Sequence, residues 1–74
     1  MMETVTLDVK GMSCQHCVKA IEDNVGEQEG VEAVNVQLEQ GKVDVRFNPE
    51  RISRAKIVEI IEEQGYDVTG ERVK

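Results

Sequence analysis

The stretch VTLDVKGMSCQHCVKAIEDNV, residues 5–25, changes its hydrophobic period in the middle. Over residues 5–9, Val and Leu alternate with Thr and Asp, which is the period of a half-buried strand. After the cysteines, apolar residues recur at the spacing of one helical face, at Cys17, Ala20, Ile21 and Val25, with Lys19, Glu22 and Asp23 turned outward. The stretch therefore predicts a strand, a loop that contains Cys14, and a helix whose first turn contains Cys17.

The middle of the chain predicts a β-hairpin. Gly26 and Gly30 flank a polar turn. Alternating apolar residues follow in two runs, Val34, Val36 and Leu38, then Val43, Val45 and Phe47. The Gln40-Gly41 pair between the runs indicates the hairpin turn, because glycine tolerates the positive φ that such turns need. Asn48-Pro49 is expected to end the third strand.

A second helix and a short fourth strand are predicted in the last third of the chain. Ser53 can cap the helix, with Ile52 and Ile57 placed as a hydrophobic staple around it. The buried stripe of this helix is expected to be Ile57, Ile60 and Ile61. Gly65 is a C-terminal stop, and a strand over residues 66–69 leaves a frayed tail at residues 70–74.

The predicted order of elements is βαββαβ. This order favours an α+β fold, a ferredoxin-like sandwich in which a four-stranded antiparallel sheet carries two helices on one face. We expect a single domain over residues 1–74, with its core at about residues 3–69. Such a fold assigns no function by itself. It does place the two cysteines at an edge of the sandwich.

Length and charge restrict the class of function. A chain of 74 residues can hardly hold both a core and a catalytic cavity of several hundred cubic ångströms, which favours a binding or carrier module over an enzyme. The net charge of -6 disfavours nucleic acid, whose phosphates bind basic patches. No basic segment precedes an apolar run, and no segment approaches the roughly 18 apolar residues of a membrane span. We therefore expect a cytoplasmic protein without membrane insertion.

The chemistry of the chain is concentrated at Cys14 and Cys17, its only two cysteines. A helix N-terminus offers unpaired N–H groups and a partial positive charge, which favour thiolate over thiol. Residues at i and i+3 of a helical turn lie about 5 to 6 Å apart at Cβ, close to the span of two metal–sulfur bonds. One metal ion could be held between the two sulfurs.

Three uses of the cysteine pair stay open at this point. A closed zinc site is disfavoured because it needs four ligands, and the chain has one C-x-x-C pair and one histidine, His16. Thiol-disulfide chemistry is a fairer rival, since C-x-x-C at a helix start is also its motif. A soft monovalent ion such as Cu(I) suits two thiolates without oxygen ligands, and we favour it.

The run Gly11-Met12-Ser13-Cys14-Gln15-His16-Cys17, together with Gln64-Gly65-Tyr66-Asp67-Val68, resembles the heavy-metal-associated domain family. Within that family the chain is most similar to the bacterial copper chaperones, and the resemblance covers residues 3–69. It implies Cu(I) bound by Cys14 and Cys17, carried through the cytosol and handed to the metal-binding domains of a copper-transporting P-type ATPase. Some members also supply copper to a copper-responsive repressor. The sequence leaves open whether the protein is a monomer or a homodimer in which two molecules bridge copper through four cysteines. The alternatives are a small thiol-disulfide oxidoreductase and a module that sequesters mercury, silver or zinc.

Five residues are expected to surround the two sulfurs: Lys10, Met12, Ser13, His16 and Tyr66. Met12 invites assignment as a thioether ligand, but methionine more often fills gaps in the core, and the resemblance agrees with a core position. His16 is expected to be solvated, and it could tune proton or metal exchange. The resemblance places Tyr66 beside the metal loop, where its ring would screen the sulfurs. Lys10 and Lys19 flank the motif and could offset the negative charge of two thiolates with one Cu(I).

Overall fold

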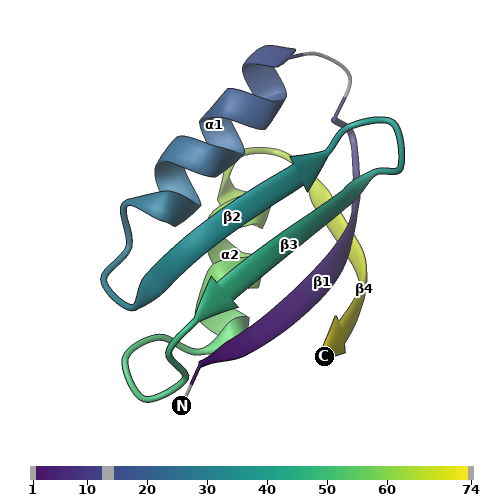
Figure 1. Ribbon diagram of the computed structural model, residues 1–74. Coiled ribbons are helices and arrows are strands. Elements are labelled where there is room, and N and C mark those ends of the chain that lie inside the picture. The colour runs from purple at the N-terminus through teal and green to yellow at the C-terminus, as the bar shows by residue number, and fades with distance from the viewer. Residues whose placement is uncertain (1, 13–14, 74) are drawn as a thin grey trace.

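The computed structural model describes residues 2–12 and 15–73. The elements, in chain order, are β1 (Glu3–Lys10), α1 (Gln15–Gly26), β2 (Val31–Gln37), β3 (Lys42–Phe47), α2 (Arg54–Glu63) and β4 (Asp67–Val73). The predicted βαββαβ order is therefore confirmed (Figure 1).

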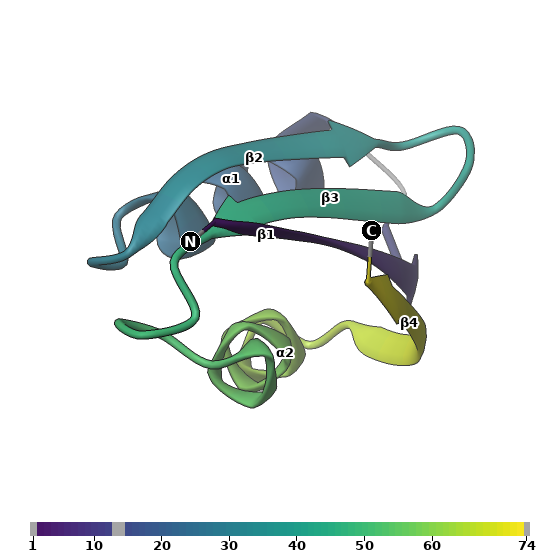
Figure 2. The ribbon, with the colours of Figure 1, turned by 60° about the horizontal axis from the view of Figure 1, so that its bottom comes forward.

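The four strands form one antiparallel sheet in the order β2-β3-β1-β4. Both helices lie behind this sheet in the view of Figure 1, as the ferredoxin-like arrangement requires. Figure 2 shows the same two-layer arrangement along the sheet, with α2 lying below the strands. Because β1 is an inner strand, its C-terminal end is held by neighbours on both sides, and this is the end from which the cysteine motif departs.

The core fills the space between the sheet and the helices. The buried residues follow the predicted periods, with alternate residues from the strands and one stripe from each helix: Val5, Leu7, Val9, Val43, Val45 and Phe47 from the sheet, and Ile21, Val25, Ile57, Ile60 and Ile61 from the helices. Lys19, Glu22 and Asp23 are exposed, as the helical pattern predicts. Burial of these apolar side chains is the main source of stability, at about 1.5 to 3 kcal/mol for each fully buried one.

The helix α2 begins and ends where the sequence predicts. The Ser53 hydroxyl accepts a hydrogen bond from the Lys56 N–H at 3.1 Å, which satisfies one of the unpaired donors of the first turn. Ile52 and Ile57 on either side of the cap are both buried. At the other end the Gly65 N–H donates to the Glu62 carbonyl at 2.9 Å.

The turn between β2 and β3 differs from the prediction by one residue. β2 ends at Gln37, so Leu38 lies in the turn rather than in the strand. Two hydrogen bonds close the turn: Gln40 N–H to the Gln37 carbonyl and Gly41 N–H to the Leu38 carbonyl, both at 3.2 Å. Gly41 has a φ of 65°, which is the left-handed conformation that glycine adopts without strain.

The fourth strand is longer than predicted, and its start at Tyr66 is also wrong by one residue. β4 begins at Asp67 and continues to Val73, so residues 70–73 are part of the sheet rather than a frayed tail. Two interactions with β1 explain the extension: Val5 pairs with Val73, and Arg72 Nη2 lies 2.9 Å from the Asp8 carboxylate. Most side chains of this segment are exposed, so their sequence carries little hydrophobic alternation. Lys74 lies outside the described residues.

Candidate metal centre

The cysteine motif lies at the junction of β1 and α1. Cys17 is the third residue of α1 and is half-buried, which confirms its predicted place in the first turn of a helix. Cys14 and Ser13 lie outside the described residues, so the predicted sulfur geometry and the place of Ser13 are not among the observations. The two residues between the cysteines, Gln15 and His16, are exposed.

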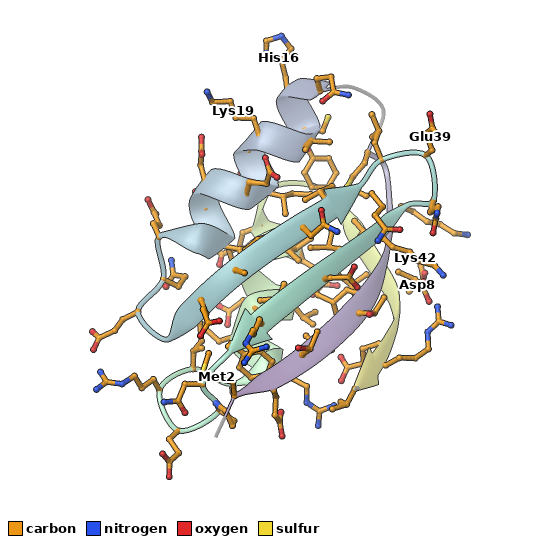
Figure 3. All side chains as sticks on the ribbon, viewed as in Figure 1. Met2, Asp8, His16, Lys19, Glu39 and Lys42 are labelled. Carbon is orange, nitrogen blue, oxygen red and sulfur yellow. The ribbon has the colours of Figure 1, made fainter. Side chains whose placement is uncertain are left out.

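The electrostatic setting of this helix start suits an anionic ligand. The first turn of α1 carries no acidic residue, so no carboxylate competes for its N–H groups and partial positive charge. Lys19 and Lys10 are both exposed near the motif. Figure 3 shows His16 at the tip of α1, pointing away from the sheet. The setting therefore favours thiolates at the cysteine positions, with an exposed imidazole beside them.

Met12 packs against the hydrophobic core and is half-buried. A core position is the one expected for an unbranched thioether that fills irregular space. The side chain thus fixes the loop from the side of the core.

Tyr66 lies against the start of the same loop. A β-carbon placed on Gly11 would be 3.3 Å from Tyr66 Cδ1, so the ring packs closely over the glycine backbone. Gly11 has a φ of 100°, so a side chain there would be strained as well as crowded. Tyr66 is half-buried and also packs on the core. The expected contact between the Gly-Tyr segment and the metal loop is therefore present on the Gly11 side.

Lys10 ends β1 and is exposed. Its partner across the β1–β4 pair is Asp67, so opposite charges face each other at the base of the loop. The pairing holds Lys10 near the motif without burying its charge.

The turn over residues 38–41 is a neighbour of the site that the sequence analysis missed. A groove of about 390 Å³ runs between this turn and residues 8–12, and a second groove of about 430 Å³ runs between the turn and the first turns of α1. Leu38 lines both grooves. Figure 3 shows Glu39, also in the turn, at the same end of the molecule as His16. The available signal was topological: antiparallel pairing of β1 with β3 puts the end of one beside the start of the other.

Within residues 2–12 and 15–73, no three His, Cys, Asp or Glu side chains gather closely enough to hold a metal ion. In the same part of the chain, neither helix is long and apolar enough to cross a membrane.

Comparison with known families gives the assignment. The sequence model of the heavy-metal-associated domain matches residues 6–67. The chain belongs to the heavy-metal-associated domain family. Among curated proteins, the copper chaperone CopZ of Bacillus subtilis is 61% identical over 67 residues, which cover 90% of this chain and 97% of the relative.

Solved structures with the same fold include members of this family. A structure described as CopZ metallochaperone superposes with a TM-score of 0.87 at 38% identity, covering 89% of this chain and 98% of the other. The N-terminal domain of a potential copper-translocating P-type ATPase from Bacillus subtilis, in its Cu(I)-loaded state, gives a TM-score of 0.89 at 31% identity, covering 97% of this chain and 92% of the other. These similarities confirm the ferredoxin-like fold of the heavy-metal-associated domains.

Proposed function

We propose that this chain is a cytoplasmic copper chaperone that binds Cu(I) through Cys14 and Cys17. The observation that carries the proposal is the 61% identity to a copper chaperone across nearly the whole of both chains. The position of the motif supports it, because Cys17 occupies the first turn of a helix without a carboxylate in that turn. In this proposal the chain is a single domain over residues 1–74, and it carries metal rather than acting as an enzyme.

The choice of Cu(I) rests on the donor set. Two soft thiolates suit a monovalent soft ion that accepts two or three ligands, whereas a closed zinc site needs four. The described residues bring no further cluster of His, Cys, Asp or Glu to this end of the molecule. Lys10 and Lys19 offset part of the negative charge that two thiolates and one Cu(I) leave.

The proposed recipient is a metal-binding domain of a copper-transporting P-type ATPase. The Cu(I)-loaded ATPase domain of similar fold supports this partner. An ion held by two sulfurs at the edge of the molecule has room for a third ligand, so a thiolate of the partner can bind before either original sulfur leaves. Transfer to a copper-responsive repressor is a further expectation of the resemblance, and a copper-bridged homodimer stays an alternative to the monomer.

The proposal is tested by anaerobic titration with Cu(I), using wild type, Cys14→Ser, Cys17→Ser and the double variant. Each single variant loses one of two donors, so we expect Cu(I) affinity to fall by orders of magnitude while the unfolding transition changes little. His16→Ala serves as the matched control and should bind nearly as wild type does. Near-native affinity in the double variant, measured against a competing chelator, would end the assignment.

Three further measurements separate the remaining alternatives. X-ray absorption of the loaded protein should show sulfur ligands only, at one Cu(I) for each chain. A thiol-disulfide oxidoreductase would instead reduce a disulfide substrate catalytically, and we expect no such turnover. Sedimentation of the loaded protein distinguishes a monomer from a copper-bridged dimer.

A further inference from the structure

The base of the metal loop is the C-terminal end of β1. Four residues, Lys10, Gly11, Met12 and Ser13, separate Val9 from Cys14 in the sequence. Val9 is buried, with only 4% of its surface exposed, whereas Lys10 is exposed. Val9 is therefore the last residue of β1 that packing in the core holds in place. A displacement of Val9 is therefore passed to a segment that has only four residues before Cys14 in which to absorb it.

Gly41 holds this strand end from the side of the β2–β3 turn. The Val9 N–H donates to the Gly41 carbonyl oxygen at 2.7 Å, one residue beyond the pairing of Asp8 with Lys42. The two backbones also lie close together at the α-carbon of Gly41, because a β-carbon added there would lie 3.1 Å from the Val9 carbonyl oxygen. Because the neighbour is backbone, relief would require the end of β1 or the turn itself to shift.

Gly41 also lies beside the loop in space. The groove of about 390 Å³ that borders the turn is lined on its other side by Lys10, Gly11 and Met12. On the far side of Gly11 lies Tyr66, at close contact distance. The start of the metal loop is thus bracketed by the turn and by the Tyr66 ring.

We propose that Gly41 is a positioning residue for the metal loop. It acts by allowing Val9 to approach the turn closely, which fixes where the loop leaves the sheet. A β-carbon at this position should displace the loop and weaken Cu(I) binding. The inference rests on the proposed Cu(I) site for its consequence, but its structural part concerns the metal-free protein alone.

The test uses Gly41→Ala and Gly41→Asn. Both variants add the β-carbon that meets Val9, but asparagine tolerates a left-handed φ far better than alanine. If strain in the turn is the only effect, Gly41→Ala should lose stability and Gly41→Asn should lose little. Displacement of the loop by the β-carbon should instead be seen in both variants. Gly26→Ala is the control, since a β-carbon at Gly26 has nothing within 4 Å and its φ is not in the left-handed region.

The readouts are backbone amide NMR shifts of residues 9–11 in the metal-free protein, the urea unfolding midpoint, and Cu(I) affinity against a chelator. We expect both Gly41 variants to shift the amides of residues 9–11 and to bind Cu(I) about five-fold more weakly, the ratio that ~1 kcal/mol of strain produces. Gly41→Asn should unfold at a higher urea concentration than Gly41→Ala, because asparagine tolerates the left-handed φ better.

Wild-type affinity and unshifted amides at residues 9–11 in Gly41→Asn would overturn the proposal, as would an equal loss of affinity in Gly26→Ala. If wild type itself bound no Cu(I) through sulfur, the proposed function would fail instead. The amide shifts of the metal-free variants would then decide alone whether Gly41 positions the loop.

Discussion

Met12 lies in the metal loop and Tyr66 lies between α2 and β4, and both pack against the hydrophobic core. Substitutions that keep the volume of Met12 or the ring of Tyr66 can separate packing from a direct role at the metal. Met12 is the only methionine close to the cysteines in the sequence, so its role as ligand or as core side chain needs a direct test.

Met12→Ala should destabilise the fold without removing a copper ligand. Truncation of a half-buried methionine leaves a partial cavity, so we expect a loss of about 1–2 kcal/mol in the free energy of unfolding, below the range for fully buried methionine. Met12→Leu retains the volume and should restore most of that loss. Urea unfolding and X-ray absorption of both loaded variants check this. A thioether signal that disappears in Met12→Leu would make Met12 a ligand.

Tyr66→Ala should affect copper exchange more than copper affinity. It removes the ring that packs over Gly11 and opens one side of the loop to incoming ligands. We therefore expect faster loss of Cu(I) to a chelator, measured by stopped flow, with a smaller change at equilibrium. Tyr66→Phe keeps the ring and is the matched control. Equal exchange rates in Tyr66→Ala and wild type would mean that the ring does not screen the site.

At the scale of elements, α2 begins at the opposite end of the molecule from the start of α1 (Figure 1). Its cap and the extension of β4 can therefore be altered with the motif left intact. Two predictions concern these elements, one at the cap and one in the strand.

Ser53→Ala removes the side-chain acceptor of the Lys56 N–H. Loss of an N-cap of this kind costs about 1 kcal/mol of stability, while Ser53→Asp retains an acceptor and should cost much less. We expect Cu(I) affinity to stay at the wild-type value in both variants, because the cap is remote from the motif. Thermal unfolding and chelator competition measure the two effects, and a fall in affinity would show that the ends of the sandwich are coupled.

Deletion of residues 70–74 tests the extension of β4. The segment pairs with β1 through the backbone and through the exposed Asp8–Arg72 ion pair, which on its own contributes at most about 1 kcal/mol. With several backbone hydrogen bonds lost as well, at about 0.5–1.5 kcal/mol each, we expect the free energy of unfolding to fall by roughly 1–3 kcal/mol. Arg72→Ala in the full chain isolates the ion pair. A deletion without effect would mean that this end of β4 is frayed in solution.

These elements also show what the sequence could and could not predict. In strands with one buried face, such as Val5 to Val9, apolar residues recur at every second position, which predicts the strand. The helix α2 could be predicted from its capping residue Ser53 and from its isoleucines at helical spacing. The end of β4 shows no such pattern, because its stability comes from pairing with β1 rather than from burial. The position of Cys17 in the first turn of α1 was predicted correctly from the change of the hydrophobic period after β1. Gly41 was predicted as a turn residue only, since its contact with Val9 depends on register between distant strands.

At the scale of the whole molecule, three segments distant in sequence meet at one end of the sandwich: the junction of β1 and α1, the turn over residues 38–41, and the segment at Tyr66. The sandwich supplies the framework, and the proposed ligands lie at its edge. This arrangement combines a fixed scaffold with access for a second protein, which is what rapid transfer requires.

An asymmetry follows for the two proposed ligands. Cys17 belongs to α1 and is half-buried, whereas Cys14 precedes the helix in sequence. We therefore expect Cys14 to release copper first and Cys17 last. In mercury-adduct trapping with a partner domain, Cys14→Ser should reduce capture of the partner less than Cys17→Ser does, because the shared intermediate is held through Cys17. The reverse order would make Cys17 the first sulfur to release the metal.

The most direct test of the account mixes the Cu(I)-loaded protein with a metal-free metal-binding domain of a P-type copper ATPase and follows both by NMR. A ligand-sharing intermediate predicts transfer much faster than spontaneous release of Cu(I) into a chelator of similar affinity, and a rate that rises with the concentration of the recipient domain. Transfer no faster than spontaneous release, and independent of the recipient's concentration, would contradict the chaperone assignment and leave copper storage in its place.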